Sequence, residues 1–341
     1  RRLASESVIY DAAYATSPWT LPSHVSAMTG LPSHRLGLDF EHQTYDKSVP
    51  TLAERYRRQG YRTAAVISNT FLHPRSGFQR GFDAYEHSGR ALDLCRTAPG
   101  ALLDAHWPWF AASVCNWTAE AVASRALRRM EGAGPYFLVL NFMDAHDPYF
   151  TGDVWRWETL GNDPKRYRAR YEPSYRAAIR NIDRQLAALV ARAGRDAAIA
   201  VVSDHGEHFG ERNLVRHGNS LYPELLRVPL LVRIPGRPAG RVTEPFSLAD
   251  LPTLLPPAPP APAQPVTASL IPPASFQRPR EVSVVRGAWQ LIARDNGTEE
   301  VIGAGPIPPP LLAELRAEAA RVRQAMEASR ETSFRSLGYV Q

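Results

Sequence analysis

Residues 16–30 read TSPWTLPSHVSAMTG and predict a short helix with a hydroxyl side chain at its start. Pro22 suits the first helical position, where its missing N–H costs nothing, and Gly30 can take the left-handed conformation that ends a helix. Thr20 then lies at the positive end of a helix dipole, beside backbone N–H groups that bind phosphate or sulfate readily. Thr20 is therefore a candidate nucleophile, and an ordinary helix cap is the alternative.

A second stretch with chemical character follows a predicted buried strand. Residues 197–203 form a short, largely apolar run, and Asp204, His205, Gly206 and Glu207 come directly after it. Ligands bind at the carboxyl edge of open parallel sheets, and an adjacent carboxylate and imidazole suit a divalent cation. The alternative is an Asp-His-Gly turn that only closes the strand.

Apolar runs alternate with longer amphipathic stretches over most of the chain, which predicts an α/β fold with helices flanking a mostly parallel central sheet. The expected strands are 63–68, 137–142, 197–203 and 230–234, and the expected helices are 49–59, 119–130 and 171–193. The first three strands end beside Asn69, beside Asp144 and His146, and beside Asp204 and His205. We expect these side chains to converge at one sheet edge.

Several motifs taken together resemble the sulfatase family of the alkaline-phosphatase-like superfamily. Thr20–His24 with Met28–Gly30 is similar to the nucleophile motif, residues 141–149 to the segment with the substrate-binding histidine, and residues 203–218 to the metal-binding block. Similarity in order and spacing extends over roughly residues 5–255,. The resemblance implies the sulfatase fold, an anionic ester as substrate and one divalent cation. Ca²⁺ or Mg²⁺ is expected, with Mn²⁺ or Zn²⁺ as alternatives.

The resemblance also gives the candidate residues three kinds of role. The metal ligands are Thr20, Asp204 and His205, the catalytic residues are Thr20, His24, His146 and His217, and the substrate-binding residues are His146, His217 and Asn69. The histidines would hold the non-reacting oxygens or protonate the leaving group. For a single histidine, a structural role is the alternative.

The nucleophile departs from the family pattern. Sulfatases use a Cys or Ser that is oxidised to formylglycine and is recognised through a following Pro and Arg. Thr20 cannot form that aldehyde, and His24 stands where the Arg would be. Direct attack by a metal-bound Thr20 hydroxyl remains. The predicted function is metal-dependent hydrolysis of anionic sulfate or phosphate esters. The alternatives are a phosphodiesterase, a phosphoglycerol- or phosphoethanolamine-type transferase, and an inactive relic or scaffold.

The start of the chain also departs from the family pattern. The family's first strand ends in acidic metal ligands, and no acidic residue before Asp11 matches them. Asp11 itself lies too close to the Thr20 helix. We expect an N-terminally truncated excerpt, because losing a central strand would leave buried backbone groups unpaired. The expected location is periplasmic, extracellular or membrane-anchored if the preceding segment carries a signal or an anchor.

Composition divides the chain into three parts. Residues 1–255 form the predicted catalytic domain, within which residues 86–118 read as an insertion. Residues 256–280 are rich in proline and alanine and predict a linker,. Residues 281–341 predict a small C-terminal α+β subdomain, with a hairpin over 281–294 and a charged helix over 310–330,.

Charge and hydropathy exclude some kinds of partner. The formal charge is +6, yet the arginines are dispersed, which argues against nucleic acid as a partner and agrees with an anionic substrate,. No run of 18 apolar residues occurs, so these residues predict no membrane-spanning segment,. At 341 residues and 44% hydrophobic, the chain is long enough to bury one large core,. The oligomeric state is left open.

Overall fold

The computed structural model describes residues 2–45, 48–88, 117–147, 149, 163–255 and 265–336. Most of the expected insertion at 86–118 and the first part of the expected linker at 256–280 lie outside these residues. The chain divides into two compact units. Unit 1 comprises residues 1–50, 196–207 and 217–341, and unit 2 comprises residues 51–195 and 208–216.

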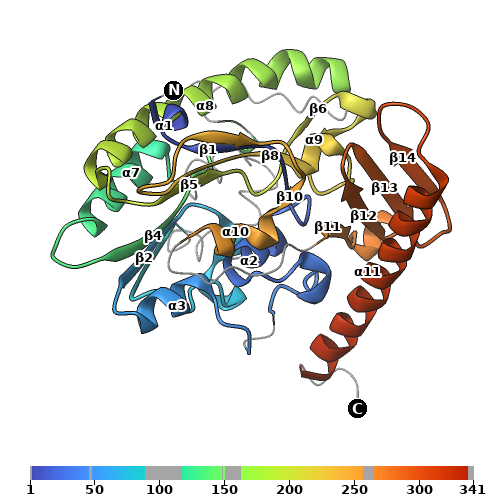
Figure 1. Ribbon diagram of the computed structural model, residues 1–341, viewed down its shortest axis with the longest axis horizontal. Helices are drawn as coiled ribbons and strands as arrows, with labels where there is room; N and C mark the ends of the chain where they lie inside the picture. Colours follow the sequence, from blue (N-terminus) through green and yellow to red (C-terminus); the bar gives the residue numbers. More distant parts are fainter. Residues whose placement is uncertain are drawn as a thin grey trace, which may run out of the picture. The chain divides into compact units, whose positions relative to one another are not determined.

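A mixed sheet forms the centre of unit 1 (Figure 1). Its strands are β1 (Val8–Tyr14), β5 (Ile199–Val202), β8 (Arg227–Arg233), β9 (Gly240–Val242) and β10 (Phe246–Ser247). β8 runs antiparallel to both β1 and β5, whereas β9 and β10 run parallel to β1. Alternate side chains of β1 and β8 are buried in one apolar core, but β5 lies at the end of the strand order and is only partly buried.

The helix of the nucleophile motif, α2 (Thr20–Thr29), begins two residues earlier than predicted. Pro22 takes the third helical position, where a missing N–H still costs nothing because the first turn has no intrahelical acceptor for it. Gly30 has a φ of +84°, and its N–H bonds to the Ser26 carbonyl at 2.9 Å, so the helix ends where the sequence predicts. Thr20 is thus the first helical residue, not the residue before the helix.

The C-terminal part of unit 1 is a four-stranded antiparallel sheet covered by a helix (Figure 1). The strands are β11 (Val266–Leu270), β12 (Glu281–Arg286), β13 (Trp289–Arg294) and β14 (Glu299–Ile302), and the helix is α11 (Pro309–Ser336). Leu315, Ala319, Val322 and Met326 of α11 pack on β12 and β13. The predicted hairpin matches β12 and β13 to the residue, and the small C-terminal subdomain is present.

Unit 2 holds a parallel sheet of three strands in the order β3-β2-β4. The strands are β2 (Arg62–Ile67), β3 (Ala84–His87) and β4 (Tyr136–Asn141), and the helices are α3 (Leu52–Arg58), α7 (Ala119–Arg129) and α8 (Pro164–Ala193). α8 starts seven residues before the predicted Tyr171, because Asp163 caps it by accepting the N–H groups of Lys165 and Arg166,.

The described part of the chain also contains shorter elements. Besides several 3₁₀ helices of one turn, they include α1 (Arg2–Ser5), α9 (Pro223–Leu226), α10 (Leu251–Leu254) and the two-stranded ladder of β6 (His208–Phe209) with β7 (Val215–Arg216). Among the described residues, no helix has both the length and the apolar character that crossing a bilayer would require.

The α/β fold class is confirmed, but the strand arrangement differs from the expectation in two respects. β2 and β4 pair in unit 2, whereas β5 pairs in unit 1, so the expected strand ends belong to two described sheets. β8 returns antiparallel to β5, because the connection between them contains only short elements and no long crossover helix,. β1 was not among the predicted strands, since Asp11 interrupts its apolar run.

Candidate functional site

Thr20 is a buried residue at the start of α2 in unit 1. Its backbone carbonyl accepts a hydrogen bond from His24 Nδ1 at 3.0 Å. His24 Nδ1 also lies 3.2 Å from Asp204 Oδ2. Because both partners are acceptors, Nδ1 carries the ring hydrogen. The first turn of α2 is thereby tied to the end of β5.

Asp204 stands at the centre of a group of polar side chains. One carboxylate oxygen, Oδ2, faces His24 Nδ1 at 3.2 Å and His205 Nε2 at 3.4 Å. The Asp204 backbone carbonyl accepts the hydroxyl of Ser23 at 2.5 Å. Residues that are 180 positions apart in the sequence, on α2 and after β5, therefore converge on one aspartate.

His205 is oriented by the loop after β5. Its Nδ1 lies 2.8 Å from the Gly206 carbonyl and therefore carries a hydrogen, which leaves Nε2 directed at Asp204,. The loop allows no side chain at Gly206, since a Cβ there would lie 2.1 Å from the Glu224 carbonyl oxygen. Gly206 N–H also donates to the Leu225 carbonyl at 2.7 Å. The glycine thus lets this loop pack against the short helix α9.

His217 is oriented by the carboxylate of Glu207, a residue without a predicted role. Its Nδ1 lies 3.2 Å and 3.3 Å from the two carboxylate oxygens of Glu207, whose side chain is only 6% exposed. The His217 ring also packs on His205, with 4.3 Å between the ring centroids. The signal for Glu207 was present, because it closes the same Asp-His-Gly-Glu run as the predicted ligands. Its two carboxylate oxygens fix the orientation of the His217 ring.

Charge and burial oppose one another in this cluster. Burial raises the pKa of Asp204, but the imidazoles of His205 and His24 outweigh that effect and hold the pKa well below its usual range. Burial lowers the pKa of His24, yet Asp204 brings it above its ordinary value. For His205, burial prevails and lowers the pKa, so its neutral form is favoured,.

The donor set fits part of a cation site. In neutral His205, Nε2 carries a lone pair, so two acceptors face each other across 3.4 Å with no hydrogen between them,. Two ligands of one ion with bonds of 2.0–2.5 Å lie about 3 to 3.5 Å apart. Among the described residues, no group of three or more His, Cys, Asp or Glu side chains could hold a metal ion. Asp204 and His205 thus fit two positions of such a site.

The remaining predicted residues, Asn69 and His146, belong to unit 2. Asn69 caps the short helix over residues 70–72, accepting the Phe71 N–H at 2.8 Å. His146 Nδ1 lies 2.7 Å from the Asp147 carbonyl. Asp144 is buried and accepts the Ala119 N–H at 3.0 Å. Each of these side chains makes a local contact that orders the loop around it.

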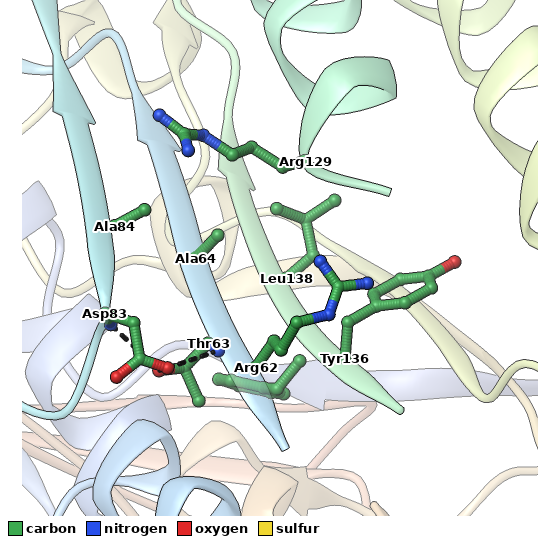
Figure 2. A pocket seen from close by; sticks show the side chains of 9 residues that line it. Arg62, Thr63, Ala64, Asp83, Ala84, Arg129, Tyr136 and Leu138 are labelled. Atoms are coloured by element: carbon green, nitrogen blue, oxygen red, sulfur yellow. Dashed lines mark hydrogen bonds between the residues drawn. The ribbon is translucent and has the colours of Figure 1, made fainter. Parts of the chain in front are cut away.

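Unit 2 also contains a cavity of about 210 Å³, shown in Figure 2. It lies where β2 and β4 begin, at the opposite strand ends from Asn69 and His146. Its polar side chains are engaged, since Asp83 accepts both the N–H and the hydroxyl of Thr63 at 3.0 Å and Arg62 donates to the carbonyls of residues 131–133. The cavity therefore does not include Asn69 or His146.

Comparison with known sequences finds a family profile and two relatives that match most of the chain. The Sulfatase family profile matches residues 1–256. The uncharacterized sulfatase YidJ of Escherichia coli K12 is 22% identical over 305 residues, and the choline-sulfatase of Rhizobium meliloti 1021 is 27% identical over 319 residues. In both cases the match covers 74% of this chain and 61% of the relative. The chain therefore spans about three-fifths of the length of these relatives.

Solved structures share the fold at low sequence identity. The phosphonate monoester hydrolase of Agrobacterium radiobacter has a TM-score of 0.67 at 14% identity, and the match covers 96% of this chain and 90% of that one. BT4656, solved with its substrate D-glucosamine-2-N,6-O-disulfate, has a TM-score of 0.68 at 14% identity, with coverage of 97% and 92%. These similarities show that the chain shares its fold with these two proteins.

Proposed function

This chain belongs to the sulfatase family, and we propose that it hydrolyses anionic sulfate or phosphate-type esters with Thr20 as the nucleophile. The observation that carries the proposal is the convergence of His24 and His205 on Asp204 Oδ2, with His24 also bonded to the Thr20 carbonyl. The names of the relatives, a choline-sulfatase and a phosphonate monoester hydrolase, agree with this substrate class.

Asp204 and His205 would hold a divalent cation together with further donors. When bound, such an ion supplies positive charge that polarises the ester and lowers the pKa of a neighbouring hydroxyl. β5 ends two residues before Asp204, and among the described strands it pairs with β8. The identity of the ion stays a proposal, with Ca²⁺ or Mg²⁺ first and Mn²⁺ or Zn²⁺ as alternatives.

The protein residues would then divide the reaction into two displacements. The Thr20 hydroxyl would give up its proton as its oxygen attacks the phosphorus or sulfur atom. The bond to the organic oxygen breaks, and the leaving oxygen takes up a proton. Water next attacks the threonyl ester and releases Thr20 with inorganic or monoester product. His217 is suited to the proton transfers, because Glu207 fixes Nδ1 and leaves Nε2 on the other side of the ring,.

Thr20 also favours one ester class over the other. A threonyl phosphoester can be cleaved by attack at phosphorus, whereas a threonyl sulfate lacks the hydrated aldehyde through which formylglycine expels sulfate. We therefore infer a preference for phosphodiesters or phosphonate monoesters. A transferase of the phosphoglycerol or phosphoethanolamine type would use the same first step and pass the group to an alcohol instead of water.

The proposal is tested by kcat/KM for paired p-nitrophenyl esters, one a sulfate and one a phosphodiester, with Thr20→Ala as the blank. Turnover should depend on Thr20 and be faster for the phosphodiester, and Thr20→Ser should retain part of it. A preference for sulfate that disappears in Thr20→Ala would overturn the phosphoryl assignment. If neither ester is turned over in a Thr20-dependent way, the hydrolase proposal fails and the inactive scaffold is favoured.

A further inference from the structure

A buried aspartate closes a tight turn beside the candidate site in unit 1. Asp39 is only 4% exposed, and its Oδ1 accepts the backbone N–H groups of Glu41 at 2.8 Å and His42 at 2.7 Å. His42 Nδ1 lies 2.9 Å from the same oxygen, and the Asp39 N–H donates to the His42 carbonyl at 3.0 Å. The carboxylate therefore fixes the shape of residues 39–42.

The last turns of α11 reach this segment. α11 packs first on β12 and β13 and then continues beyond that sheet (Figure 1). There Arg330 Nη2 lies 3.4 Å from Asp39 Oδ2, and its side chain is only 19% exposed. Ser329 Oγ donates to the His34 carbonyl at 2.9 Å. The C-terminal helix is thus joined to residues 34–42 by an ion pair and a hydrogen bond.

An aromatic stack connects the turn to the residues that flank the candidate catalytic groups. Phe40 stacks on Trp19, with 4.3 Å between ring centroids and 16° between the planes. Trp19 is buried and directly precedes Thr20 at the start of α2. Phe40, a residue of the 39–42 turn, therefore fixes the position of the Trp19 ring.

The same stack borders the residue after His217. Gly218 has a φ of +73°, and a Cβ on it would lie 3.3 Å from Phe40 Cζ. The Gly218 N–H donates to the Pro18 carbonyl at 3.0 Å. Residues adjacent to Thr20 and to His217 thus contact one aromatic pair, whose position depends on the turn closed by Asp39.

We propose that Arg330 and Asp39 are positioning residues, through which the C-terminal helix holds the Trp19–Phe40 stack against the segments that carry Thr20 and His217. The catalytic consequence rests on the proposed function, but the mechanical coupling does not. Displacing catalytic groups by about 1 Å can cost as much as 100-fold in rate, so a distant pair that fixes their backbone acts on turnover more than on substrate affinity.

The test compares Arg330→Met, which keeps most of the aliphatic stem, with Arg321→Met on the same helix. Arg321 pairs with Glu318 on the exposed face of α11. Arg321→Met therefore removes the same charge as Arg330→Met but leaves the contact with the 39–42 turn in place. Hydrogen exchange is measured in the full chain for peptides covering residues 17–24, 36–45 and 214–220. Arg330→Met should speed exchange in all three by about 10-fold, and Arg321→Met should leave them unchanged.

Kinetics provide the second readout. For the preferred ester, Arg330→Met should lower kcat by about 10-fold to 100-fold with KM within about 3-fold, and Arg330→Lys should recover most of the loss. Phe40→Leu repeats the test without altering the helix, should Arg330→Met fail to fold. Unchanged exchange over residues 17–24 in folded Arg330→Met or in Phe40→Leu would overturn the proposal. Faster exchange in a protein that turns over no ester would support the coupling and refute only the proposed function.

Discussion

The loops that follow β4 and β5 look alike in sequence but differ in what surrounds their aspartates. Each strand leads to an aspartate with a histidine close behind it, Asp144 with His146 and Asp204 with His205. Asp144 accepts hydrogen bonds from the Ala119 N–H at the start of α7 and from Asn181 Nδ2 on α8. Asp204 instead faces two imidazole nitrogens through one oxygen.

The difference is visible in the acidity of the two carboxyl groups. Burial raises the pKa of Asp144, and the hydrogen bonds that it accepts only partly offset this. The histidines around Asp204 reverse the same effect of burial and lower its pKa. The two aspartates therefore differ in the groups that surround them. Asp144 joins α7 and α8 to the loop after β4, whereas Asp204 meets imidazoles from α2 and from its own loop.

The largest expected effect concerns His217, proposed for the proton transfers, and His146, to which the family resemblance gives a role in substrate binding. His217→Ala and His146→Ala should each lower turnover by about 10²–10⁴, the usual range for a positioned acid–base or anion-stabilising group. Metal content, measured by elemental analysis, should stay near one ion per chain. His73→Ala is the control, because the His73 ring accepts the Arg75 N–H in a short turn and has no role in the proposed reaction. Loss of the ion in either variant would make that histidine a metal ligand.

A smaller effect is expected from the glycine that shapes the loop after β5. In Gly206→Ala the new Cβ would collide with the Glu224 carbonyl, so folding stability should fall by about 2 kcal/mol or more,. Gly240→Ala in β9 is the matched control, since no atom lies within 4 Å of a Cβ at that position and its φ is ordinary. Chemical denaturation of both variants measures the difference. Equal stability would show that the loop relaxes and that Gly206 does not set its geometry.

The smallest expected effect is a difference in pH dependence between the two aspartates. A carboxyl group whose pKa is raised in the folded state stabilises the fold fully at pH values below its unfolded pKa. This stabilisation is lost as the pH rises through the folded pKa. The stability of Asp144→Asn should therefore improve relative to that of the parent toward neutral pH,. A carboxyl group whose pKa is lowered in the folded state stabilises the fold above its unfolded pKa and loses this effect as the pH falls. The parent should therefore become more stable relative to Asp204→Asn as the pH rises from the acid range,.

Denaturation at a series of pH values with chelator present measures both profiles. Each slope should be at most about 1.4 kcal/mol per pH unit, because one proton is involved in each case. Profiles of the same sign for the two variants would contradict the proposed difference between their surroundings.

Local signals in the sequence located many elements well. The hairpin of β12 and β13 was predicted to the residue because a Gly-Ala turn separates two apolar runs, and Gly30 ended α2 as expected. The start of α8 was missed because Asp163 and Pro164 form a start signal that lies seven residues before the predicted helix,. The error arose because the apolar periodicity from residue 171 was weighed above this capping signal.

The pairing of strands and the contacts of the site were harder to predict, because they depend on residues far apart in the chain. Asp204 and His205 are neighbours in the sequence, but the sequence does not show which other histidines contact the Asp204 carboxylate. In the structure, His24 reaches it from α2. Glu207 was visible as a carboxylate in the motif, yet its contact with His217 depends on how residues 208–216 return the chain. The grouping of β2 and β4 apart from β5 is likewise a long-range property.

The most direct test of the proposed site compares divalent-ion binding by the Asp204→Asn and Asp144→Asn variants of the protein. Calorimetric titration with Ca²⁺, Mg²⁺, Mn²⁺ and Zn²⁺ should show one ion per chain for the parent and for Asp144→Asn, with Kd values within about 3-fold of each other. Asp204→Asn should weaken binding by about 100-fold or more. Equal affinity in the two variants, or loss of the ion only in Asp144→Asn, would contradict the assignment of the reactive site to the end of β5.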